Sequence, residues 1–149
     1  LTIGGNSYFG GGKSNKVLVV ADSTGQYIQR LPVVTNPNND DYYVMPVGCI
    51  SDTAVSTYPT SIRLNVNSQN RYLGMRVKDT KHPNDTSTSN YLDRYWILTD
   101  DGDTAFMKLY VQLNFPLNEV NGKQLGMHIW DGSSGANTRV ISIGRFITV

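Results

Sequence analysis

The stretch from Tyr91 to Phe115 constrains the fold more than any other part of the chain. Apolar residues occupy every other position of its second half: Ala105, Met107, Leu109, Val111, Leu113 and Phe115. The positions between them hold Lys108, Gln112 and Asn114, but also the aromatic residues Phe106 and Tyr110. Such alternation predicts a strand with one buried face. The aromatic-rich run before it and the turn-forming segment Asp100–Thr104 complete a predicted β-hairpin, with Trp96 on the core side.

The rest of the chain consists of shorter runs of the same kind. They are bounded by Gly, Pro, Asn and Asp, and they lie at residues 1–3, 16–21, 26–34, 42–47, 61–66, 72–78, 125–130, 139–143 and 145–149. Runs 16–21 and 26–34 are predicted to form a second hairpin, and alternation places Ile62, Leu64 and Val66 on one face. No segment carries a helical apolar period. We therefore predict an all-β fold, an antiparallel β-sandwich of jelly-roll or Ig-like type, with roughly ten short strands and little or no helix.

Length and composition bound the class of protein. A chain of 149 residues fits a single domain over 1–149, with residues 1–15 interpreted either as part of it or as the stub of an upstream repeat or linker region. The formal net charge of +1 offers no basic surface for nucleic acid, and no apolar run is long enough to insert into a membrane. The 14 Gly and 9 Tyr are typical of loop-rich β proteins, and we predict an extracellular or cell-surface location.

Residues suited to catalysis are few. The two histidines, His82 and His128, belong to no Ser or Cys motif, and Glu119 is the sole glutamate. His82 lies in the longest polar stretch, Asp79–Asn90, which we predict to be a surface loop. The sequence therefore favours a protein that is not an enzyme.

Two kinds of binding site are suggested by residue type alone. Asp100, Asp101 and Asp103 supply the oxygen ligands that calcium prefers, although the same residues are common in β-turns. No other cofactor is predicted. Sugar rings stack on flat aromatic side chains, and Trp130, Tyr91 and Tyr58 are candidates for such contacts, with a core position as the alternative.

The order of several motifs resembles a known family. These motifs are VLVVADSTGQYIQR at 17–30, YYVMPVG at 42–48, YPTSIRLNV at 58–66, GMRVKD at 74–79 and LDRYWILT at 92–99. The succession is similar to a β-domain near the C-terminal end of large exported proteins of Bacteroidota. That domain commonly precedes a type IX secretion sorting domain and follows adhesin-like or enzyme regions. The resemblance implies export by this route but supplies no catalytic residues.

Membership of this group also implies a modification. Bacteroidota add O-glycans at Asp-Ser/Thr followed by a small apolar residue or Thr, a pattern met at Ser23, Thr53 and Thr104. Ordinary turn chemistry explains the same three tripeptides. The predicted function is a non-catalytic accessory or structural module that spaces or presents neighbouring domains of the same chain, and the alternative is a carbohydrate-binding module of a polysaccharide-degrading enzyme.

Overall fold

Strands are the main secondary structure of the described residues. The computed structural model describes residues 2–3, 7–9, 19–21, 27–36, 38, 41–50, 55–57, 60–100, 107–123, 125–131 and 138–144, with side chains for 27–36, 38, 41–48, 60–100, 107–123 and 125–126. The strands are β1 (Thr2–Ile3), β2 (Ser7–Phe9), β3 (Val19–Ala21), β4 (Tyr27–Leu31), β5 (Asp41–Met45), β6 (Val47–Ile50), β7 (Val55–Thr57), β8 (Thr60–Asn67), β9 (Arg71–Lys78), β10 (Tyr91–Asp100), β11 (Met107–Gln112), β12 (Gly126–Asp131) and β13 (Thr138–Gly144). A single turn of 3₁₀ helix, η1 (Leu117–Glu119), lies between β11 and β12. The predicted all-β class is confirmed, and no helix within these ranges is long and apolar enough to cross a membrane.

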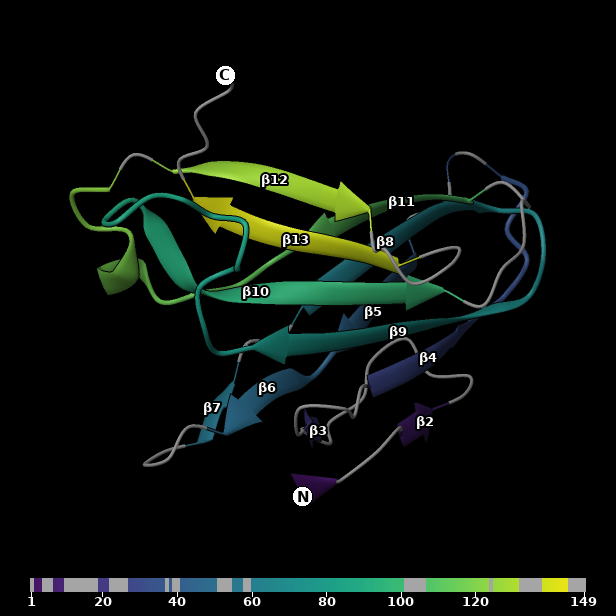
Figure 1. Cartoon of the computed structure of the whole chain (residues 1–149). Coiled ribbons are helices and arrows are strands. Elements are labelled where there is room, and N and C mark those ends of the chain that lie inside the picture. The colour runs from purple at the N-terminus through teal and green to yellow at the C-terminus, as the bar shows by residue number, and fades with distance from the viewer. Residues whose placement is uncertain are drawn as a thin grey trace.

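Three sheets are present (Figure 1). The largest has the strand order β12-β13-β10-β9-β4-β2, the second β11-β8-β5, and the third β1-β3-β6-β7. Most pairs are antiparallel, as predicted, but β1–β3, β3–β6 and β2–β4 are parallel. Side-chain alternation indicates which residues share a face. It does not indicate the direction of the neighbouring strand, so the parallel pairs were not predicted.

The predicted hairpin over 91–115 does not form. β10 lies between β9 and β13 in the six-stranded sheet, whereas β11 pairs with β8 in the three-stranded sheet. The second predicted hairpin is wrong in the same way, because β3 pairs with β1 and β6 while β4 pairs with β9 and β2. Consecutive strands in this chain often change sheet, and each then finds partners far away in the sequence.

The six-stranded and three-stranded sheets share one core. In Figure 1, β5 and β8 pass behind β9 and β10. One buried cluster contains side chains of both sheets, together with Val47 of β6: Tyr27, Leu31, Tyr43, Met45, Val47, Ile62, Leu64, Leu73, Met75, Val77, Leu92, Trp96 and Leu98. Trp96 is 0% exposed, which confirms its predicted core position, and its ring centroid lies 6.3 Å from that of Phe115. Burying a large aromatic side chain stabilises a fold by about 1.5–3 kcal/mol, so Trp96 is a principal link between the layers.

An irregularity in β8 changes which side chains face this core. Leu109 of β11 pairs with Leu64, but the preceding Lys108 pairs with Val66, so Asn65 is an extra residue in β8. A bulge of this kind reverses the alternation beyond it. Val66, predicted to face inward with Ile62 and Leu64, therefore shares its register with the exposed Lys108, and Asn67 is buried in its place.

Candidate functional site

The structure tests only part of the predicted site. Asp100 and Tyr91 are the two candidates whose side chains are described. Trp130 lies in β12, where it pairs with Val140, but its side chain is outside the described part of the chain. The remaining candidates also lie outside the described residues: Tyr58 for sugar, Asp101 and Asp103 for calcium, and Ser23, Thr53 and Thr104 for O-glycans. These assignments stay predictions.

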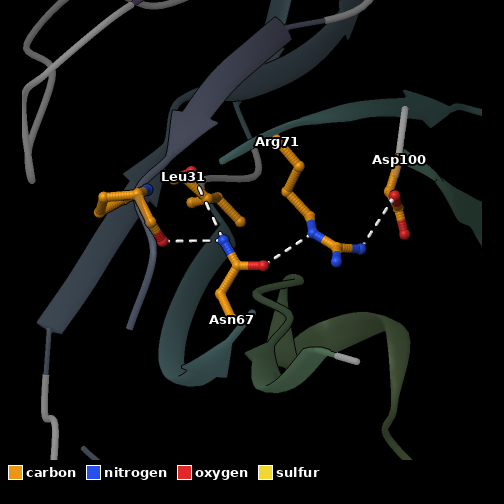
Figure 2. Close-up of polar contacts among 5 residues, drawn as sticks. Leu31, Asn67, Arg71 and Asp100 are labelled. Atoms are coloured by element: carbon orange, nitrogen blue, oxygen red, sulfur yellow. Dashed lines mark hydrogen bonds and ion pairs between the residues drawn. The ribbon is translucent and has the colours of Figure 1, made fainter. Parts of the chain in front are cut away.

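Asp100 is the last member of a buried polar chain (Figure 2). Its carboxylate forms an ion pair of 3.3 Å with Nη1 of Arg71, whose side chain is 1% exposed. Nε of Arg71 donates to Oδ1 of Asn67 at 2.8 Å, and Nδ2 of Asn67 donates to the carbonyl oxygen of Pro32 at 2.8 Å. A buried guanidinium needs such partners, since leaving it unpaired costs several kcal/mol.

This polar chain joins four strands at one end of the molecule. Asn67 ends β8, Arg71 begins β9, Asp100 ends β10, and Pro32 directly follows β4. The bulge at Asn65 is what turns the Asn67 side chain inward, so the network depends on a local feature of β8. In this structure the Asp100 carboxylate is the ion-pair partner of Arg71. Among the residues described, no group of three His, Cys, Asp or Glu side chains lies close enough together to hold a metal ion.

A second polar cluster occupies the opposite ends of β9 and β10. Arg94 is buried, and its Nε donates to Oε2 of Glu119 at 3.1 Å while its Nη2 contacts Oε1 of the same carboxylate. The carboxylate of Asp79 lies 3.8 Å from Nη2. Two-pronged pairing between Arg and a carboxylate is strong and directional. It fixes η1 against β10, a central strand of the six-stranded sheet.

The loop over Asp79–Asn90 is ordered by its own side chains, which the prediction of a plain surface loop missed. His82 and Asp85 are 5% and 4% exposed. Nδ1 of His82 accepts from the backbone N–H of Asn84 at 3.2 Å, and Oδ1 of Asp85 accepts from the backbone N–H of Ser87 at 2.8 Å. Side-chain bonds of this kind to nearby backbone are why Asp residues are common in turns, and here His82 makes one as well.

His82 also contacts the sheet directly. Its ring meets the Tyr95 ring edge-on, with centroids 4.9 Å apart. Burial lowers the pKa of His82 from its ordinary value of 6.5, and the nearby Asp85 carboxylate opposes part of that shift. The acceptor role of Nδ1 assigns the proton of the neutral ring to Nε2. The side chain is therefore neutral at neutral pH and holds the loop on β10.

Tyr91 lies beside this loop and is held by two lysines. The Nζ atoms of Lys81 and Lys123 lie 4.7 Å and 5.6 Å from its ring centroid, and Nζ of Lys123 also donates to its carbonyl oxygen at 2.9 Å. Nζ of Lys81 donates to the carbonyl oxygen of Ser87 at 2.8 Å. Cation–π contacts of this type are worth about 0.5–1 kcal/mol at partly exposed sites. The ring thus connects the loop with the turn after η1, and a sugar would have to share it with both ammonium groups.

A third site, which the sequence analysis did not find, lies on the outer face of the three-stranded sheet. Tyr42 of β5 pairs with Arg63 of β8, and Arg63 pairs in turn with Tyr110 of β11, so the three residues form one row across the sheet. Tyr42 is 50% exposed and Tyr110 46%. The Arg63 guanidinium carbon lies 4.3 Å from the Tyr110 ring centroid, and Nζ of Lys108 lies 5.7 Å from it.

The signal for this row was present in the sequence. Tyr110 occupies an outward position of β11, where the neighbouring outward residues are Lys108 and Gln112. A single exposed aromatic residue is ordinary, so Tyr110 gains meaning only from the row that it forms with Arg63 and Tyr42. That Tyr42 and Arg63 continue the row depends on strand pairing, which a single sequence does not provide.

Comparison with known proteins adds no family assignment. No protein-family model, no curated protein and no solved structure matches the chain.

Proposed function

We propose that the chain is a non-catalytic accessory module, a single β-sandwich domain of jelly-roll or Ig-like type that holds neighbouring domains of a secreted or cell-surface protein apart. The sandwich assignment is supported by the single core that the six-stranded and three-stranded sheets share. Membership in the exported Bacteroidota β-domain family, with type IX secretion, remains part of this proposal and rests on the motif order at residues 17–99.

One observation carries the spacing function. β2, near the start of the chain, lies at one edge of the six-stranded sheet, and β13, near its end, lies four positions away in the strand order. Strands in a sheet are about 4.8 Å apart, so β2 and β13 are separated by about 19 Å of sheet. Within this span, one ion pair joins β9 to β10 (Arg71 with Asp100) and another joins β10 to η1 (Arg94 with Glu119), which favours a rigid unit.

Rigidity can be measured directly. We would place the chain between two fluorescent proteins and record energy transfer molecule by molecule, with a Gly/Ser linker of equal length as the control. The proposal predicts a narrow distribution of distances that broadens only when urea unfolds the chain, whereas the linker is broad in every buffer. A native distribution as broad as that of the linker would overturn the spacing function.

Carbohydrate binding is the second candidate function, and a different observation favours it. The row Tyr42–Arg63–Tyr110 presents two half-exposed aromatic rings on one face of a sheet. Exposed rings of this kind supply rigid apolar contact area with a polar hydroxyl at the tip, which suits the mixed surface of a sugar. Among the described side chains, this row supports a glycan-binding hypothesis better than Tyr91 does, and Trp130 and Tyr58 stay predictions.

A further inference from the structure

We propose that the outer face of the three-stranded sheet binds an anionic polysaccharide, a chain whose sugars carry carboxylates. This inference rests on the carbohydrate-binding function proposed above, and it adds the location of the binding site and the chemical class of the ligand. The site consists of Tyr42, Arg63 and Tyr110 with Lys108 beside them, and nothing in its geometry involves the two buried polar clusters.

The spacing of the row fits an extended sugar chain. Tyr42 and Tyr110 stand on the two outer strands, with β8 between them. Two strand spacings of about 4.8 Å place their Cα atoms about 9.5 Å apart, which is close to the length of one disaccharide unit in an extended chain. The two rings are therefore spaced to contact alternate sugars of one chain that runs across the strands.

Arg63 occupies the centre of this row. It pairs with a tyrosine on each side, and its guanidinium is held 4.3 Å from the Tyr110 ring centroid. A guanidinium stacked on an aromatic ring keeps its charge, and its planar donor fork matches a carboxylate. A carboxylate on the sugar between the two tyrosine contacts would thus meet the cation of the row.

Charge complementarity selects an anionic ligand over a neutral one. The outward register positions of this sheet hold Tyr42, Val44, Ser61, Arg63, Val66, Lys108, Tyr110 and Gln112. The charged side chains at these described positions are Arg63 and Lys108, and both are cations. Because the whole chain has a net charge of only +1, this is a local concentration of positive charge, and such a patch recruits anions in a salt-dependent way.

The surroundings of the row favour a glycan over an acidic protein. Protein interfaces are anchored by aromatic residues set in an apolar centre. The next register row here is Val44, Ser61 and Gln112, which adds a hydroxyl and an amide but only one aliphatic side chain. Hydroxyl and amide groups can donate hydrogen bonds to sugar hydroxyls and accept hydrogen bonds from them. In the absence of a sugar, water makes these hydrogen bonds.

The test measures binding of the full chain by calorimetry and affinity electrophoresis. The probes are polygalacturonate as the acidic glycan, galactomannan as a neutral glycan, and poly-glutamate as an acidic peptide. Variants Arg63→Gln, Tyr42→Ala and Tyr110→Ala remove members of the row, and Tyr72→Ala removes an exposed tyrosine of the other sheet as the matched control. Thermal melting of each variant first establishes that it is folded.

We expect polygalacturonate to bind and its affinity to fall by at least about tenfold between about 50 mM and 500 mM salt, since screening weakens exposed charge contacts. Arg63→Gln should lose about tenfold or more, because a charge-assisted contact disappears, and each Tyr→Ala variant should lose about fivefold to tenfold. Tyr72→Ala should bind like the parent protein.

Each other outcome rejects a defined part of the proposal. Equal, salt-independent binding of galactomannan and polygalacturonate overturns the anionic ligand but leaves the carbohydrate-binding function standing. Equal binding of poly-glutamate overturns the glycan in favour of an acidic protein surface. Binding that survives in all three row variants overturns the site. Absence of binding to every probe overturns both this inference and the carbohydrate-binding candidate, and leaves the spacing function.

Discussion

β10 and β11 follow each other along the chain, but the environments of their charged side chains differ. β10 has a strand on each side, and its Arg94 and Asp100 are each held in an ion pair with a residue of another element. β11 is an edge strand, and its charged and aromatic side chains, Lys108 and Tyr110, lie in solvent. A polar side chain on a buried face must be paired to be tolerated, as Arg94 is in β10, whereas one on a solvent-facing side can be displayed.

The comparison implies that mutations on β10 will change stability, while mutations on the outer face of β11 will change binding. Removing the largest core side chain of β10 is the strongest test. Trp96→Ala should lower the free energy of unfolding by about 3–5 kcal/mol, because the cavity between the sheets cannot close fully. Leu109→Ala on β11 should cost only about 1–2 kcal/mol, since Leu109 is partly buried. Urea denaturation monitored by tyrosine fluorescence measures both, and equal losses would remove the distinction.

The ion pair of Arg94 provides the second test. Arg94→Gln leaves the partly exposed Glu119 carboxylate without its main partner, and we expect a loss of about 2 kcal/mol. Glu119→Gln in the same background should add little, because the interaction is already gone. A double-mutant cycle on the two variants measures their coupling. Additive losses would mean that the pair contributes nothing beyond the packing of each side chain.

Acid should weaken the loop that His82 holds against β10. The folded protein lowers the pKa of this group below 6.5, mainly through burial, so the unfolded chain takes up the proton first as the pH falls. The stabilising contribution of neutral His82 is complete above pH 6.5 and is lost as the pH falls from there through the lowered folded-state pKa. His82→Gln should remove this part of the pH dependence, and subtracting its stability curve from that of the parent cancels the titration of His128.

A pH profile that is identical in the two proteins would show that His82 is not shielded from solvent. A steeper loss in His82→Gln than in the parent would contradict the sign argued here. Hydrogen exchange of the amides of Asn84 and Asp85 gives an independent measure, because both bond to His82 in the folded loop.

The longer strands and most of their inward faces were predictable because they depend on local alternation, whereas the short strands β2 and β7 were not predicted. Trp96, Ile62 and Leu64 were all placed on inward faces correctly. Pairing was not predictable, because β10 meets residues 71–78 and 138–144, and loop lengths in the sequence do not favour these partners over the adjacent β11. The bulge at Asn65 was missed for a related reason, since it exists only relative to the partner strand.

The same distinction applies to the candidate sites: residue types could be recognised in the sequence, but spatial partners could not. The Asp100 carboxylate was singled out for its residue type, but Arg71, which pairs with it, is 29 residues away and could not be assigned from spacing. His82 and Asp85 belong to a stretch without apolar residues, so nothing in its composition indicated that they are buried. The row on the outer sheet face had one visible member, Tyr110, and two that only strand register reveals.

The smallest effect on stability, and the one that separates the two strands most sharply, is expected for Lys108→Gln. This change removes a cation from β11, just as Arg94→Gln removes one from β10, but Nζ of Lys108 is exposed and 5.7 Å from the Tyr110 ring. Its contribution to folding should stay within about 0.5 kcal/mol. Affinity for polygalacturonate should nevertheless fall severalfold, because one of the two cations of the face is lost. A change in urea midpoint as large as that of Arg94→Gln would show that the outer face of β11 serves the fold, and the contrast with β10 would no longer hold.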